Sequence, residues 1–212
     1  MRQILCYGDS NTWGCIPVIG PDPPRRFQPD ERWPGVLRRE LGDGYWIVED
    51  GLNGRTTVWD DGLEPHANGR RLLLPLLFTH QPLDLVILML GTNDLKRRFG
   101  VSAAEVAEGV AALVDVVGAS GAGPAGAAPH VLVISPPPLG RLGQFADVFE
   151  GADRKSRQLA DVLGATAALR GCAFLDAGAH VASSDVDGIH LDREAHAALG
   201  VVVAREVLGI VE

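Results

Sequence analysis

The chain has 212 residues, of which 46% are hydrophobic and 22% are charged, a composition typical of globular proteins rather than of disordered chains. With 19 basic and 27 acidic side chains, it carries a formal net charge of −8. This acidic balance argues against a dedicated nucleic-acid-binding protein, which needs a basic face to neutralise phosphates. A chain of this length typically forms one domain, so we expect a single domain over residues 1–212.

Cysteine usage and the absence of targeting signals bear on compartment and cofactors. The cysteines Cys6, Cys15 and Cys172 have no zinc-site spacing and no even count for disulfides, as is typical of a reducing compartment. The N-terminal segment lacks the pattern of a secretion signal. No apolar run reaches the roughly 18 residues of a membrane helix. We therefore expect a cytoplasmic protein with no membrane partner, no metal and no cofactor.

Short apolar runs predict the strands. They lack a clean alternation of apolar and polar residues, which is typical of strands covered on both faces in a parallel sheet. In chain order the runs are Gln3–Tyr7, Trp46–Glu49, Leu83–Leu90, His130–Ile134 and Cys172–Leu175.

Segments with helical periodicity separate these strands. Ser102 and Glu105 are spaced to form a capping box at the start of one of them. The named segments are Asp30–Leu41, Ala103–Val117, Gly151–Leu169 and Asp192–Leu208. Alternating strands and helices predict an α/β fold, a three-layer α/β/α sandwich around a five-stranded parallel sheet. Right-handed crossovers would place functional loops at the carboxyl ends of its strands.

Glycine and proline, with 26 and 14 residues, are more frequent than in an average chain. Part of this excess lies in Gly118–Pro129, which we expect to be a flexible connection. Another part lies in the Pro-rich segment Cys15–Pro29. Long loops inside compact domains often act as lids or pocket walls, but the sequence does not assign such a role to Cys15–Pro29.

A serine directly follows the first predicted strand, in the segment Gly8-Asp9-Ser10-Asn11. On a strand-to-helix turn, its hydroxyl would project above the carboxyl edge of the sheet. The backbone N–H groups of the next helical turn would point the same way, toward negative charge. Taken alone, the segment also fits an ordinary helix N-cap.

An acid–histidine pair lies near the other end of the chain, where Asp187 precedes His190 by three residues. Such a carboxylate can bond Nδ1 of the imidazole and leave Nε2 free to act as a base. The same sequence also fits a surface turn. By spacing, Asp185 and Asp192 are poorer partners.

Gly-containing loops follow the second and third predicted strands. Gly51–Thr57 (GLNGRTT) allows the backbone to approach a ligand closely, and Gly91–Asp94 (GTND) presents the Asn93 amide as a donor. Each fits a simple turn on its own. Together with the serine and the Asp–His pair, however, they gather a nucleophile, a base and polar donors at one sheet edge.

This ordered set of motifs resembles the SGNH (GDSL-type) hydrolase family. The matching blocks are Gly8-Asp9-Ser10, Gly54, Gly91-Thr92-Asn93-Asp94 and Asp187 to His190, in the family's order over nearly the whole chain. The strings ILCYGDSNTWG, GLNGRTT, DLVILMLGTND and VDGIHL are most similar to the aryl-esterase and acyltransferase branch. The resemblance implies a flavodoxin-like fold and a serine esterase for short-chain acyl esters, with acyl transfer to alcohols or hydrogen peroxide.

The resemblance also implies roles for individual residues. Ser10 would be the nucleophile, His190 the base and Asp187 the orienting acid. The oxyanion donors would be the backbone N–H groups of Ser10 and Gly54 and the side chain of Asn93. These roles are chemically consistent, because serine is a weak nucleophile until a base accepts its proton.

The predicted substrate pocket contains Asn11, Trp13, Ile16, Phe27 and Asn53. Its apolar side chains would favour small hydrophobic acyl and alcohol groups, although the aromatic residues also fit a core or a subunit contact. By excluding water, the same wall would favour an alcohol as the acyl acceptor. The branch often carries Ser-Ala where this chain has Asn53-Gly54. Glycine restores the broader family's residue, so we expect the oxyanion N–H to remain and Asn53 to alter the pocket.

The expected partners are a small-molecule acyl ester and an alcohol acceptor, and the resemblance implies a homo-oligomer. Two alternatives remain open. A carbohydrate O-acetylesterase uses the same four motifs, and turnover of sugar acetates would favour it. A non-catalytic α/β binding module would have a silent serine, and an inert Ser10 toward a fluorophosphonate probe would favour that alternative.

Overall fold

The computed structural model describes residues 1–20 and 23–211, and its centre is a parallel sheet of five strands in the order β2-β1-β3-β4-β5. This order is the flavodoxin-like variant of the doubly wound fold. The predicted fold class is therefore confirmed, with strand ends within a few residues of the apolar runs. The strands are β1 (Arg2–Gly8), β2 (Tyr45–Gly51), β3 (Leu85–Met89), β4 (His130–Ser135) and β5 (Ala173–Asp176).

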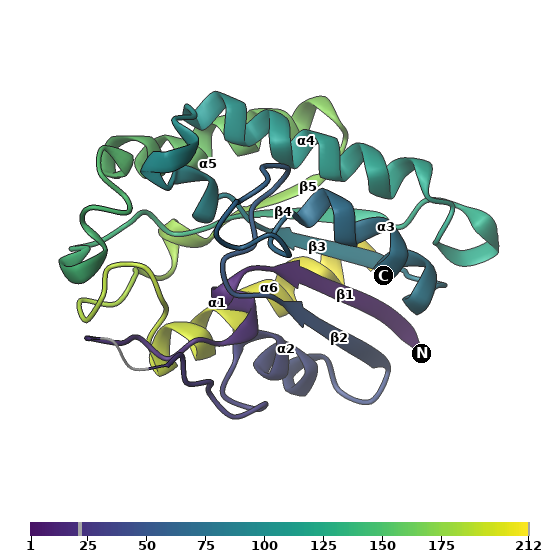
Figure 1. Ribbon diagram of the computed structural model, residues 1–212. Helices are drawn as coiled ribbons and strands as arrows, with labels where there is room; N and C mark the ends of the chain where they lie inside the picture. Colours follow the sequence, from purple (N-terminus) through teal and green to yellow (C-terminus); the bar gives the residue numbers. More distant parts are fainter. Residues whose placement is uncertain (21–22, 212) are drawn as a thin grey trace.

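Helices cover both faces of the sheet (Figure 1). One face carries α2 (Trp33–Leu41) and α6 (Arg193–Val211). The opposite face carries α3 (Gly69–His80), α4 (Ala103–Ala119) and α5 (Ala152–Leu169). Successive side chains of a strand point to opposite faces, so β1 supplies both cores from one continuous apolar run. The three layers form because both sheet faces are apolar.

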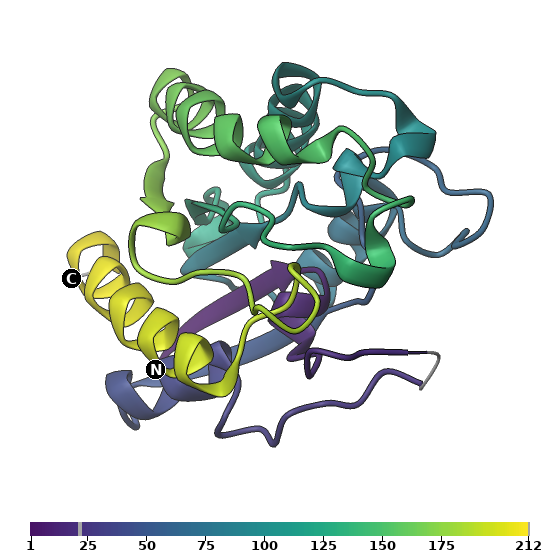
Figure 2. The ribbon, with the colours of Figure 1, turned by 90° about the vertical axis from the view of Figure 1, so that its left-hand side faces the viewer.

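The register of the central strands positions the loops that follow them. Gly8 at the end of β1 lies opposite Gly51 of β2 and Met89 of β3. Because these three strands end at the same level, the chain segments after them emerge side by side at the carboxyl edge. This edge faces the viewer in Figure 2.

Helix α2 begins at Trp33 rather than at the predicted Asp30. Its second residue is Pro34, which has no backbone N–H and whose ring would clash with the carbonyl of Asp30 in a longer helix. Proline is favoured in a first helical turn, so Pro34 sets the start of α2.

The sequence patterns identified no residue range for α3, which contains Pro75 in its interior. Proline normally breaks a helix at such a position. Here the buried side chains of Leu73 and Leu77 pack into the core on one sheet face, and this burial outweighs the lost hydrogen bond. At the start of α4 the predicted capping box between Ser102 and Glu105 is confirmed.

The connection Gly118–Pro129 is more ordered than predicted. Its residue Ala122 is fully buried, and the carbonyl of Ala122 accepts a hydrogen bond from the backbone N–H of Leu83 at 2.8 Å. Pro124–Gly126 form a short 3-10 turn. Separately, none of the helices found in the described residues is both long and apolar enough to cross a membrane.

Candidate active site

Ser10 is the first residue of the short helix α1 (Ser10–Trp13), which follows β1 directly. Asp9 is the N-cap of this helix, and its Oδ1 accepts a hydrogen bond from the backbone N–H of Asn11 at 3.0 Å. The tight turn requires glycine at position 8, where a Cβ atom would lie 2.0 Å from Oγ1 of Thr12. The N-cap interpretation therefore holds for Asp9, while Ser10 lines a cavity at the carboxyl edge.

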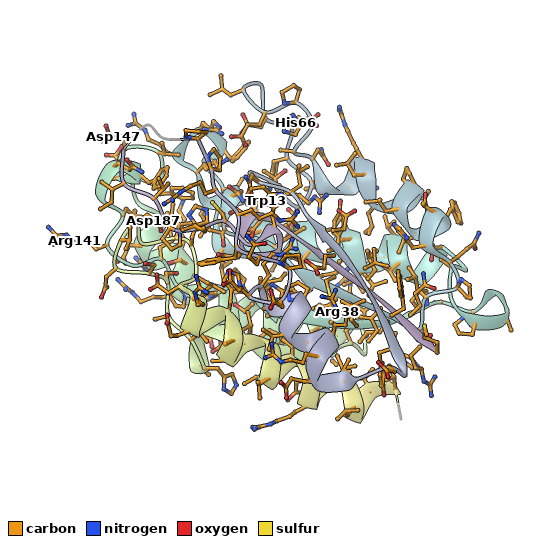
Figure 3. The ribbon with its side chains drawn as sticks, turned by 90° about the horizontal axis from the view of Figure 1, so that it is seen from below. Trp13, Arg38, His66, Arg141, Asp147 and Asp187 are labelled. Carbon is orange, nitrogen blue, oxygen red and sulfur yellow. The ribbon has the colours of Figure 1, made fainter. Side chains whose placement is uncertain are left out.

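Ser10, His190 and Asp187 form a continuous hydrogen-bonded series. Nε2 of His190 lies 3.1 Å from Oγ of Ser10, and Nδ1 lies 2.7 Å from Oδ2 of Asp187. The backbone N–H groups of Ile189 and His190 donate to Oδ1 of Asp187 at 3.0 and 2.9 Å. Asp192, the alternative partner, instead accepts a hydrogen bond from Ser184. Figure 3 shows Asp187 at the same end of the molecule as Arg141.

Hydrogen bonding shifts the pKa values of this pair in opposite directions. Burial would raise the pKa of Asp187, but the hydrogen bonds from His190 and from two backbone N–H groups hold it below its usual range. Burial would lower the pKa of His190, but the bond to Asp187 and the neighbouring Cys15 raise it well above its ordinary value. The site therefore stabilises the imidazolium that forms when a base accepts a proton.

Asn11 connects the serine helix to the histidine loop. Its Nδ2 donates to the carbonyl of Ile189 at 3.1 Å, and its Oδ1 accepts from the backbone N–H of Leu191 at 3.0 Å. These two bonds flank His190 in the chain. Asn11 thus fixes the base relative to Ser10 and does not line the cavity.

The predicted oxyanion donors converge on the same cavity, which is lined by Ser10, Gly54 and Asn93. Gly54 has a φ of 79°, a left-handed conformation that favours glycine. Nδ2 of Asn93 donates to Oδ2 of Asp9 at 3.3 Å, which orients the amide at the sheet edge. Burial raises the pKa of Asp9 to about 6, although the Asn11 N–H and nearby positive charges act against this shift.

Arg55 fastens the Gly54 loop to the ends of two strands. Its Nη1 donates to the carbonyls of Gly8 and Asp50 at 2.8 and 2.6 Å, and its Nη2 donates to Oδ1 of Asp50 at 2.7 Å. The guanidinium also lies 4.0 Å from the ring centre of Tyr7. Because Arg55 is buried, this loop is held rigidly beside the serine turn.

A second brace joins the loop after β2 to the loop after β3. The backbone N–H of Thr57 donates to both oxygens of Asp94 at 3.0 and 3.2 Å, and the Thr57 hydroxyl donates to Oδ1. Asp94 directly follows Asn93. The brace therefore fixes Gly54 and Asn93, two of the three predicted oxyanion donors, relative to each other.

The cavity has a volume of about 740 Å³. Its apolar wall consists of Val18, Pro24, Phe145, Val148, Phe149 and Ile189, and its polar lining includes Cys15, Asn53, Glu64, Lys96, Arg98 and Gln144. The part of the Cys15–Pro29 loop that the structure describes supplies several of these residues and so forms part of the cavity wall. Pro21 and Asp22 lie outside the described residues.

Of the five predicted pocket residues, only Asn53 lines this cavity. The side chains of the other four make contacts elsewhere or lie beside the cavity. Trp13 packs against Arg26, whose guanidinium carbon lies 5.0 Å from the centre of the Trp13 ring. Phe27 is buried against His196 at a ring distance of 5.3 Å, and Ile16 is half-buried beside the cavity-lining Cys15. Asn11 is the bridge described above.

Sequence reasoning missed the cavity residues Glu64, Lys96, Phe145 and Phe149. Lys96 comes two residues after the GTND motif, so the motif itself could have indicated it. Phe145 and Phe149 lie in the segment that follows the carboxyl end of β4. Glu64 carries no local signal. Across residues 1–20 and 23–211, no group of three or more His, Cys, Asp or Glu side chains is arranged to hold a metal ion.

A serine hydroxyl, an imidazole and a carboxylate in hydrogen-bonded series define a site of the serine-hydrolase class. Residues 6–198 match the GDSL-like Lipase/Acylhydrolase family, and the chain belongs to this family. The resemblance to SGNH hydrolases is thereby confirmed.

Solved structures resemble this chain over its whole length. An aryl esterase from M. smegmatis is 43% identical, with a TM-score of 0.95 and coverage of 99% of this chain and 100% of that one. A carbohydrate acetylesterase from Sinorhizobium meliloti is 41% identical, with a TM-score of 0.95 and 99% coverage of both chains. An acetylxylan esterase from Xylanibacter ruminicola is 34% identical over 94 residues, which are 44% of this chain and 17% of that protein. The chain thus spans under a fifth of that relative.

Proposed function

We propose that the chain is a serine carboxylic ester hydrolase that cleaves short-chain acyl esters through an acyl-enzyme. The observation that carries this proposal is the 3.1 Å separation between Nε2 of His190 and Oγ of Ser10, with Asp187 on the other ring nitrogen. This distance lies within the hydrogen-bond reach that general-base activation requires. The aryl esterase and acetylesterase structures described above support the same class of reaction.

In the first half-reaction, Oγ of Ser10 attacks the ester carbonyl carbon while His190 accepts the hydroxyl proton. The carbonyl oxygen becomes an oxyanion, and the donors at Ser10, Gly54 and Asn93 stabilise it. Each such donor typically contributes about 2.7–4 kcal/mol to transition-state stabilisation. The tetrahedral intermediate then expels the alcohol, which takes the proton from His190, and leaves an acyl group on Ser10.

In the second half-reaction, water attacks the acyl-enzyme and His190 removes its proton. The carboxylic acid leaves and Ser10 regains its hydrogen. Asp187 stays ionised throughout and stabilises the imidazolium, in keeping with its lowered pKa.

We further propose that an alcohol or hydrogen peroxide can replace water in the second half-reaction. The apolar wall at Val18, Phe145, Val148 and Phe149 supports the transfer to an alcohol, because such a surface retains an apolar alcohol better than water. Product analysis of an ester incubated with excess alcohol measures the ratio of transfer to hydrolysis. A homo-oligomer remains a prediction that analytical ultracentrifugation can test.

Carbohydrate acetylesterase activity is the second candidate. It is favoured by the charged residues Glu64, Lys96 and Arg98 in the cavity lining and by the likeness to a carbohydrate acetylesterase over the whole chain. The two candidates share one chemistry and differ in the alcohol part of the ester.

Hydrolysis of p-nitrophenyl acetate by the wild-type chain and by Ser10→Ala tests the proposed class. We expect steady turnover by the wild type and loss of at least about 10⁴-fold in kcat for the variant, since serine is the group that forms the covalent intermediate. A variant that retains wild-type kcat would overturn the proposal.

A further inference from the structure

The cavity contains an ion pair that the proposed reaction does not use. Nζ of Lys96 lies 3.1 Å from Oε2 of Glu64, and both residues line the cavity together with Ser10 and His190. The Lys96 side chain is only 7% exposed, whereas that of Glu64 is 38% exposed. The ammonium is thus largely withdrawn from bulk water, and the carboxylate borders the open space of the cavity.

The carboxylate of Glu64 lies directly against the oxyanion loop. A Cβ atom built on Gly54 would lie 2.0 Å from Oε2 of Glu64 and 2.8 Å from its Cδ. The absence of a side chain at position 54 is what makes room for the carboxylate. The ion pair therefore lies beside one of the predicted oxyanion donors.

Neighbouring side chains leave hydrogen-bonding groups of this ion pair free. Arg98, which also lines the cavity, donates through Nε to Oδ2 of Asp61 at 3.0 Å. Among the described residues, the ammonium of Lys96 donates to Glu64 and to no other group. An ammonium has three N–H donors and a carboxylate accepts several hydrogen bonds, so both groups retain capacity for a ligand.

An adjacent ammonium and carboxylate suit a hydroxyl, which can accept a hydrogen bond from one and donate to the other. Hydrogen bonds to ionised groups are roughly twice as strong as neutral ones. A site built to bind a hydroxyl also rejects an analogue that lacks it, because its polar groups would then lose their partners. The apolar residues Phe145 and Phe149 in the same lining can contact the carbon skeleton of such a ligand.

We propose that Glu64 and Lys96 form a hydroxyl-binding subsite that selects esters whose alcohol part is a polyol. This inference rests on the proposed esterase function and specifies its substrate class. Glu64 and Lys96 are specificity-determining residues in this account and take no part in proton transfer or bond cleavage.

A matched pair of substrates tests the subsite. Glycerol monoacetate and propyl acetate share the acyl group and a three-carbon alcohol, and they differ in hydroxyls. We expect the wild type to prefer glycerol monoacetate by at least tenfold in kcat/KM. Glu64→Leu and Lys96→Met should bring this ratio close to one, whereas Glu206→Gln, on the exposed side of α6, should keep the wild-type ratio.

The ratio of the two substrates separates the subsite from general effects on catalysis or folding, which change both rates together. A wild-type ratio near or below one would overturn the subsite, as would an undiminished preference in the Glu64→Leu variant. Failure of the proposed esterase function would look different, because the wild type would then hydrolyse neither ester nor p-nitrophenyl acetate. Glu64→Gln keeps a similar shape without the charge and supplies the second variant if Lys96→Met fails to fold. This variant should also show a smaller preference for glycerol monoacetate than the wild type.

Discussion

The backbone N–H of Val18 donates a hydrogen bond to Oδ2 of Asp187 across 3.1 Å, the same oxygen that lies 2.7 Å from Nδ1 of His190. Val18 also lines the cavity. The segment around Val18 therefore forms part of the pocket wall and also positions the Asp187 carboxylate that bonds His190. The side chain of Gln144 makes two hydrogen bonds to the backbone of the same segment. Its Oε1 accepts from the N–H of Gly20 at 2.6 Å, and its Nε2 donates to the carbonyl of Val18 at 3.0 Å. Gln144 thus bonds to a segment that forms part of the pocket wall and helps to align the base.

Gln144→Ala should reduce kcat/KM for p-nitrophenyl acetate by roughly tenfold, since it removes two hydrogen bonds that contribute about 1 kcal/mol each. We expect kcat to fall and KM to rise together, as is usual for residues that hold a loop over a site. Gln158→Ala, at an exposed position on α5, is the matched control. Equal kinetics for both variants would show that the Gln144 contacts do not hold the loop.

The rate should rise with pH through a midpoint above 6.5, the ordinary pKa of histidine. The bond to Asp187 and the neighbouring Cys15 outweigh burial and raise the pKa of His190, and only the neutral imidazole can accept the proton of Ser10. This places the midpoint above the value of about 6.5 that the sequence alone suggests. Because the folded-state pKa of His190 is raised, the contribution of this histidine to stability is complete below about pH 6.5 and is lost as pH rises through the folded value. The contribution of Asp187, whose pKa is lowered, is instead lost as pH falls through its folded value.

Profiles of kcat/KM between pH 5 and pH 10 check this prediction. Asp187→Asn removes the partner that raises the pKa of His190, so its midpoint should be lower and its kcat smaller by about 10⁴-fold. A wild-type rate that does not vary with pH, or a midpoint below 6.5, would contradict the role of His190 as the base.

Asn93→Ala should lower kcat by about 10²–10³-fold and leave KM nearly unchanged, because an oxyanion donor stabilises charge that develops only in the transition state. The measurement is steady-state hydrolysis of p-nitrophenyl acetate by the folded variant. A change confined to KM would place Asn93 in substrate binding instead.

Thr57→Val should lower both stability and activity, since Asp94 loses the hydroxyl that holds it in the interior. Loss of one partner of a buried hydrogen bond typically costs about 1–3 kcal/mol in the free energy of unfolding. Urea denaturation measures this cost, and kcat reports on the displaced donors. Thr79→Val is the matched control, because the Thr79 hydroxyl donates to the carbonyl of Pro75 on the exposed side of α3. Its free energy of unfolding should therefore change little. An equal loss of stability in both variants would contradict the role of Thr57 in holding Asp94.

Much of the fold could be predicted because the inner strands β1, β3 and β4 are buried on both faces and so contain continuous apolar runs. Helix α4 carries its own start signal in Ser102 and Glu105. Helix α3 could not be found in the same way, because its helical conformation around Pro75 depends on tertiary burial of Leu73 and Leu77.

The residues Ser10, Asp187 and His190 could be predicted because each lies in a short motif whose geometry is local. Apart from Asn53, the predicted pocket residues do not line the cavity, and most of its wall could not be predicted, because residues such as Glu64 and Phe149 reach the site through long loops whose paths depend on tertiary contacts. Trp13 shows the limit of sequence proximity, since it lies three residues from Ser10 and yet packs against Arg26 outside the cavity lining.

The most direct test of the account is covalent labelling with a fluorophosphonate probe, followed by mass spectrometry of the labelled peptides. Such probes react with a serine whose hydroxyl is activated by a neighbouring base. We predict one adduct per chain on Ser10, abolished in Ser10→Ala and much slowed in a variant that lacks the imidazole of His190. An unlabelled wild-type chain, or an adduct on another residue, would contradict the claim that Ser10 is the nucleophile.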